Sequence, residues 1–124
     1  MKNLHSTLLL AVFLTSATSC KKDSDATAKM LMGRWELQEG FRNGQPSESL
    51  AGLFFEFGVE GKMSTNLPLM ELSSKSTFSA DPEKIIQRQG ETEVEYQIET
   101  LSDSVLIVNT KLRNYDFRFV LKKK

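Results

Sequence analysis

The chain has 124 residues, with 16 basic and 16 acidic side chains, one cysteine and one histidine. This length suits one domain, and the balanced charge gives no indication of nucleic-acid binding. We expect the closing Lys122-Lys123-Lys124 run to be a solvated tail and not a phosphate-binding patch. A single cysteine excludes an internal disulfide.

Residues 1–19 have the layout of a secretory signal peptide. Lys2 supplies a basic start, residues 8–14 form an apolar core, and small residues follow as far as Ser19. The apolar run is much shorter than the roughly 20 residues that a membrane-spanning helix needs. We therefore expect residues 1–19 to be removed and the remaining chain to be exported.

Removal of this segment takes away the only histidine, His5, together with one basic residue and no acidic residue. The mature chain then has 15 basic and 16 acidic side chains, a balance of −1. Without histidine or a free thiol, Ser–His and Cys–His nucleophilic sites and ordinary zinc sites are excluded. We expect no catalytic residue, no metal and no cofactor. We therefore expect that the protein is not an enzyme. A hydrolase that uses Glu56 and a second carboxylate is the remaining enzymatic alternative, and no spacing requires it.

The mature chain alternates apolar and polar residues with the period of half-buried β-strands. Residues 29–32 are expected to form a helical turn that plugs one end of the fold. Strands are expected over residues 34–41, 53–57, 62–66, 85–88, 93–99, 105–110 and 115–121. Turn residues separate them, so we predict an all-β fold over residues 31–124: a small antiparallel meander barrel or curved sheet.

Two features of the mature chain have alternative interpretations. Residues 67–82 have no clear period and include Pro68 and Pro82, which is typical of a mobile or functional segment. The outward glutamates of the strand at 93–99 fit a solvated face, where charge discourages edge pairing. A calcium or acid–base role for them would need ligands from other strands.

Ala17-Thr18-Ser19-Cys20 resembles the lipobox of bacterial lipoproteins, in which the cysteine is lipidated and becomes the new N-terminus. Ala17 stands where a larger aliphatic residue is usual. The resemblance implies a lipid at Cys20, a polar tether over residues 20–30, and a membrane anchor in the bacterial cell envelope. The outer membrane is the expected location, with the periplasmic or surface face left open. A plain signal peptide with an incidental cysteine is the alternative.

Gly33-Arg34-Trp35 is similar to the Gly-x-Trp that opens the first barrel strand of lipocalins. The hairpin from Phe55 to Asn66 and the terminal Tyr-x-Phe-x-Phe-x-Leu resemble lipocalin-like lipoproteins common in Bacteroidetes. Glu60 stands where that hairpin usually has Asp, and the domain is shorter than a full lipocalin. The resemblance implies that a late arginine, Arg118 or Arg113, closes over Trp35 in a cation–π contact.

The leading functional hypothesis is a lipid-anchored, non-enzymatic binding protein that holds a small hydrophobic ligand in the barrel. The expected lining consists of Trp35, Leu37, Phe55, Phe57, Tyr96, Ile98, Phe117 and Phe119. Any β core requires the same residue types. The alternative is an envelope protein–protein interaction module with a filled barrel and no ligand. About 300 Å³ or more of enclosed apolar space would favour the ligand.

Overall fold

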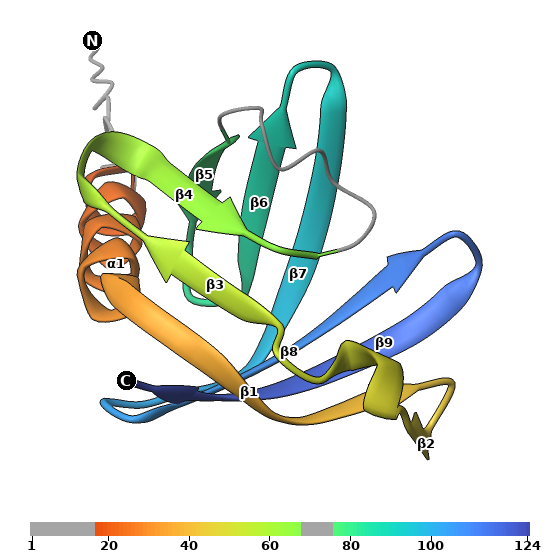
Figure 1. Ribbon diagram of the computed structural model, residues 1–124. Helices are drawn as coiled ribbons and strands as arrows, with labels where there is room; N and C mark the ends of the chain where they lie inside the picture. The colour runs from red at the N-terminus through yellow and green to blue at the C-terminus, as the bar shows by residue number, and fades with distance from the viewer. Residues whose placement is uncertain (1–16, 68–75) are drawn as a thin grey trace, which may run out of the picture.

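The computed structural model describes residues 17–67 and 76–124 and contains one helix and a single antiparallel sheet (Figure 1). The helix is α1 (Ala17–Leu31), and two 3₁₀ turns, η1 (Glu48–Leu50) and η2 (Val59–Gly61), lie in connections. The strands are β1 (Gly33–Arg42), β2 (Gln45–Pro46), β3 (Phe54–Phe57), β4 (Lys62–Thr65), β5 (Ser76–Ala80), β6 (Lys84–Gln89), β7 (Thr92–Leu101), β8 (Val105–Leu112) and β9 (Tyr115–Lys123).

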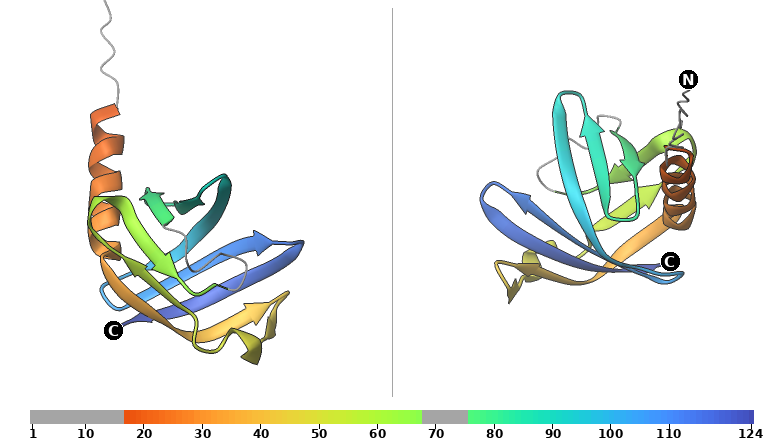
Figure 2. Two further views of the ribbon diagram at one scale, coloured as in Figure 1. Left: turned by 45° about the horizontal axis from the view of Figure 1, so that its top comes forward. Right: turned by 180° about the vertical axis from the view of Figure 1, so that it is seen from behind.

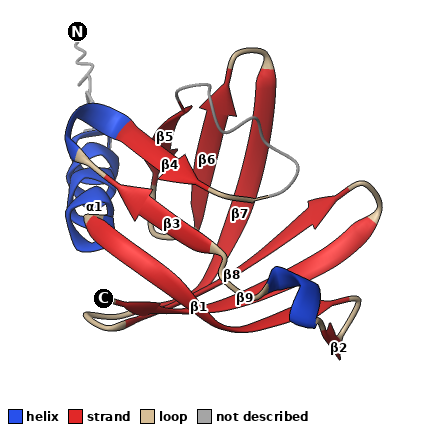
Figure 3. Cartoon of the chain, viewed as in Figure 1, coloured by secondary structure: helices blue, strands red, loops and turns tan. Residues whose placement is uncertain are grey.

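The sheet closes on itself as an eight-stranded barrel. The strands pair in the order β1-β3-β4-β5-β6-β7-β8-β9, and β9 returns to pair with β1. The two-residue β2 pairs only with the end of β1, at Phe41 and Arg42. All pairs are antiparallel, and Figure 3 shows how strands dominate the chain. The predicted all-β, lipocalin-like meander barrel is therefore confirmed.

Tight turns set the register of two of these hairpins. Asn43 and Gly44 have φ of 51° and 79°, and Arg113 and Asn114 have φ of 50° and 69°. Positive φ at both central residues is typical of the type I′ turns whose twist matches that of paired strands. Because the side-chain period of a strand is two, these turns place one set of apolar residues in the barrel interior.

Helix α1 occupies the segment that was expected to be a polar tether. Its strong helix formers, Ala and Lys, alternate with Thr, Ser and Asp, so docking of its C-terminal turn on the barrel supplies the stability that an isolated helix of this length would lack. Leu31 is fully buried at that end, and Thr27 is buried one turn earlier. The Thr27 hydroxyl donates to the carbonyl oxygen of Asp23 at 3.0 Å. The left view of Figure 2 shows the helix projecting away from the barrel toward its N-terminus.

Most of the predicted signal peptide lies outside the described residues. Within the described residues, no helix is long and apolar enough to cross a membrane. The irregular segment 67–82 also lies partly outside them, from residue 68 to residue 75. Its later part was expected to be irregular, but Ser76–Ala80 forms β5, which pairs with both β4 and β6.

Candidate interaction site

The predicted ligand lining packs into the core of the barrel, and its part around Phe55, Phe57 and Tyr96 encloses no usable space. Five of its residues are buried, with exposed fractions of 3% or less: Trp35, Phe55, Phe57, Tyr96 and Phe119. Leu37, Ile98 and Phe117 are partly buried and pack against the same core. The space between Phe55, Phe57, Tyr96 and their neighbours has no volume that a water molecule could occupy.

Aromatic contacts explain why this part of the interior is full. The ring of Phe55 meets the edge of Tyr96 with centroids 5.4 Å apart and contacts Phe119 at 6.0 Å. Phe57 meets Phe78 edge-on at 4.9 Å. Such rings pack as densely as a protein core, so this part of the barrel behaves as a hydrophobic core and not as a ligand cavity.

A buried chain of polar groups crosses the interior beside these rings. The Tyr96 hydroxyl donates to Oε1 of Gln87 at 2.5 Å, and Nε2 of Gln87 donates to the Ser76 hydroxyl at 3.1 Å. Burial raises the pKa of Tyr96 above its usual range. Gln87 was not predicted as an interior residue. Its alternation with Ile85 was the available signal, because residues two apart on a strand share a face.

The end of the barrel next to α1 is closed around Trp35. Its indole N–H donates to the carbonyl oxygen of Leu31 at 2.8 Å, and Nζ of Lys123 lies 5.2 Å from its ring centroid. The prediction that Arg118 or Arg113 would cover Trp35 is therefore wrong. Trp35 pairs directly with Lys123 across β1 and β9. Arg118 instead stacks near Phe41, and Arg113 lies in the exposed β8–β9 turn.

The barrel wall opens between β7 and β8. These strands pair only from Gln97–Asn109 to Leu101–Leu106, although each continues as part of its own hairpin. The β6–β7 and β8–β9 hairpins consequently diverge, as Figures 1 and 2 show. Nine residues from the diverging strands and the start of β9 line a cleft of about 390 Å³: Glu93, Val94, Glu95, Gln97, Asn109, Thr110, Lys111, Leu112 and Asp116.

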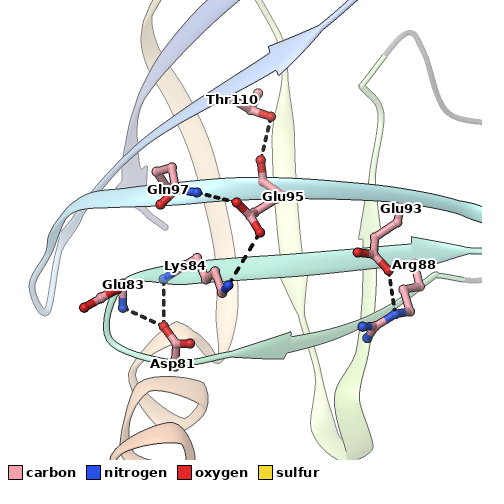
Figure 4. A network of polar contacts seen from close by, with 8 residues as sticks. All are labelled: Asp81, Glu83, Lys84, Arg88, Glu93, Glu95, Gln97 and Thr110. Atoms are coloured by element: carbon pink, nitrogen blue, oxygen red, sulfur yellow. Dashed lines mark hydrogen bonds and ion pairs between the residues drawn. The ribbon is translucent and has the colours of Figure 1, made fainter.

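One side chain bridges the base of this cleft. The Thr110 hydroxyl donates to the carbonyl oxygen of Glu95 at 2.8 Å, in place of the next ladder bond (Figure 4). The carbonyl group of Glu95 therefore points toward β8. The amide of Ile98 donates to the carbonyl oxygen of Glu83 at 2.7 Å, on the opposite side of β7. Main-chain groups alternate in direction along an antiparallel strand, so those of Glu93 and Glu95 face the cleft.

The outward carboxylates of β7 are exposed, and cations compensate three of them. Glu93 lies 3.0 Å from Nε of Arg88, and Glu95 lies 3.6 Å from Nζ of Lys84 (Figure 4). Glu99 lies 2.7 Å from the Arg118 guanidinium, whose hydrogen bonds, with that of Asn109, lower the pKa of Glu99 to about 2. Among the described residues no cluster of potential metal ligands occurs.

Other predicted site residues do not gather at this cleft. Cys20 lies on α1, and its lipidation stays a prediction. Leu67 and Phe78, two apolar residues of the 67–82 segment, are both buried. Glu56 is exposed on the outer face of β3, opposite Arg34. A second surface hollow of about 640 Å³ lies between α1, η2 and β5.

The fold and this cleft define the protein as a small, closed, lipocalin-like antiparallel barrel with an opening in its wall. Comparisons of the chain with family models, with curated proteins and with solved structures found no match.

Proposed function

We propose that this protein is a lipid-anchored, non-enzymatic module of the bacterial cell envelope that recognises another protein through the outside of its barrel. The fold supports a binding role, because a closed barrel presents its strands and hairpins on a rigid scaffold. The lipobox-like Cys20 supports the anchor. The absence of histidine after residue 5 supports a non-enzymatic role.

The filling of the interior around Phe55, Phe57 and Tyr96 is the observation that favours protein recognition over an internal ligand. Pockets for small molecules commonly enclose about 300–1,000 Å³. The space between Phe55, Tyr96 and their neighbours has no room even for water. Both polar atoms of the Gln87 side chain are hydrogen-bonded within the chain, to Ser76 and Tyr96, which disfavours a role in orienting a ligand.

Mass spectrometry of the full-length gene product, expressed in a bacterial host, tests this proposal. We expect an intact mass that corresponds to cleavage before Cys20 and addition of acyl chains, and a Cys20→Ser variant that lacks this addition. Under gentle native conditions we expect no stoichiometric small molecule. An unacylated wild-type product would overturn the anchor, and a retained apolar ligand would overturn recognition by the outer surface.

A further inference from the structure

The opening between β7 and β8 exposes strand edges that are paired elsewhere in the barrel. β7 continues to Thr92 and β8 to Leu112, but their mutual pairing ends at Gln97–Asn109. Over the described parts of the chain, the main-chain groups of Glu93 and the amide of Glu95 have no ladder partner on this side. A strand edge of this kind is a template for another extended chain.

We propose that this cleft binds an extended segment of a partner protein by strand addition to β7, alongside residues 92–96. The inference rests on the proposed recognition function and names the form of the partner. Main-chain hydrogen bonds to a sheet edge give such complexes their affinity, and alternate side chains give them specificity. The cleft volume of about 390 Å³ admits a short segment and not a folded domain.

The two faces of the cleft specify the side chains of the partner segment. A residue placed opposite Val94 would point inward, where Val94 is buried and Leu112 is partly buried. Residues placed opposite Glu93 and Glu95 would point outward, toward carboxylates that also pair with Arg88 and Lys84. The cleft lining as a whole remains acidic, with Glu93, Glu95 and Asp116 against Lys111. Cross-strand pairs of opposite charge stabilise a sheet. The segment should therefore alternate apolar residues with lysine or arginine.

The same charges disfavour a second copy of this chain as the occupant. Residues 91, 93 and 95 are all glutamate. Antiparallel pairing of two copies of residues 91–95 in register would place glutamates directly opposite one another, and like charges in this position are destabilising. A basic segment from a different protein meets no such repulsion.

A synthetic peptide of alternating lysine and valine, seven residues long, is a suitable probe. Amide hydrogen exchange of the full chain, followed by NMR, should slow about tenfold or more at Glu93 and Glu95 when the peptide binds, as expected for newly formed hydrogen bonds. The amides of Val94 and Tyr96 face β6 and should not change. Unchanged exchange at Glu93 and Glu95, or slow exchange at both before peptide is added, would overturn the proposal.

A proline substitution separates main-chain pairing from charge attraction. Glu93→Pro removes an amide that faces the cleft and leaves the β6–β7 ladder intact, because proline is tolerated where the amide makes no ladder bond. We expect peptide affinity to fall about tenfold, the effect of roughly one main-chain hydrogen bond. Glu93→Thr is the matched control, which loses the same charge but keeps the amide. An equal loss of affinity in both variants would overturn strand addition.

N-methylated peptides give a second readout that does not depend on folding of the proline variant. Methylation of alternate amides along one edge of the peptide should abolish binding, and methylation along the other edge should preserve it. Equal behaviour of the two peptides would contradict pairing through one edge. Because the proposed function is tested by the mass of the purified protein, a negative peptide result would overturn strand addition alone.

Discussion

Trp35 and Leu31 join the helix to the barrel: the indole N–H of Trp35 donates to the carbonyl oxygen of Leu31 at 2.8 Å, and both residues are fully buried. The carbonyl lies in the last turn of α1, where main-chain oxygens have no partner within the helix. The first barrel strand therefore caps the helix that precedes it. This contact ties the Gly-x-Trp pattern of the sequence to closure of one end of the fold.

Replacement of Trp35 by phenylalanine should destabilise the protein through this carbonyl. A buried acceptor left without a donor costs about 1–3 kcal/mol, in addition to the loss of indole packing. Equilibrium denaturation in urea should show the decrease in the free energy of unfolding. Lys123→Met, which removes the cation over the ring and a long 3.5 Å hydrogen bond to the exposed carbonyl oxygen of Met30 but keeps the indole donor, is the comparison and should cost about 0.5–1 kcal/mol. Equal effects of the two changes would contradict a capping role for the indole.

The buried pair Tyr96 and Gln87 should behave as a coupled unit. Tyr96→Phe leaves Oε1 of Gln87 without its donor, at a cost of about 1–3 kcal/mol. Gln87→Leu likewise removes the acceptor of the Tyr96 hydroxyl. The double variant removes both polar groups, so its decrease in the free energy of unfolding should be smaller than the sum of the decreases in the two single variants. A double-mutant cycle measures this difference, and strict additivity would show that the two groups do not interact in solution.

Glu99 should make stability depend on pH in the acidic range. Hydrogen bonds from Arg118, then from Asn109, lower the pKa of Glu99 from 4.5 to about 2. A lowered folded-state pKa gives stability that is complete above the unfolded value and is lost as pH falls toward about 2. Because the Glu99 side chain is 41% exposed, solvent screening limits this contribution to about 0.2–1 kcal/mol.

The matching measurement compares Glu99→Gln with the parent chain. The variant should unfold at lower denaturant concentration at pH 7, and the difference should shrink as the pH approaches 2. Glu91→Gln, at the exposed tip of the β6–β7 hairpin, is a control for loss of a surface carboxylate. If the loss of stability in Glu99→Gln persists unchanged at pH 2, the charge of the carboxylate is not the source of that loss.

Strands with clean alternation were predictable, and elements that depend on tertiary contacts were not. Tyr96 and Ile98 were correctly placed inward because strand periodicity is local. The end of α1 matches the helical turn expected at residues 29–32, but the rest of the helix was missed because Thr, Ser and Asp interrupt its stronger helix formers and docking of Leu31 holds it. β5, Ser76–Ala80, was missed because serine and threonine dominate it, and its place depends on pairing with β4 and β6.

The functional residues were less predictable, because they depend on register. Sequence resemblance implied an arginine over Trp35, but pairing of β1 with β9 places Lys123 there. The glutamates of β7 were predictable as a solvated face. The free edge beside them was not, because it arises where β7 and β8 cease to pair at Gln97–Asn109. No local sequence pattern in β7 or β8 predicts where the two strands diverge.

Gly40 lies toward the end of β1 that is away from Trp35, and there β1 approaches η1 closely. This approach allows a direct test of the packing between the two elements. A β-carbon at Gly40 would lie 2.9 Å from Cδ1 of Leu50 and 3.1 Å from Cδ2 of Leu37. Gly40→Ala should therefore overpack this region and cost about 1–3 kcal/mol in the free energy of unfolding. Gly58→Ala is the matched control, because its β-carbon would meet only the carbonyl oxygen of Lys62 at 3.7 Å. If urea denaturation finds both alanines equally tolerated, η1 does not pack against β1 as tightly as these distances require.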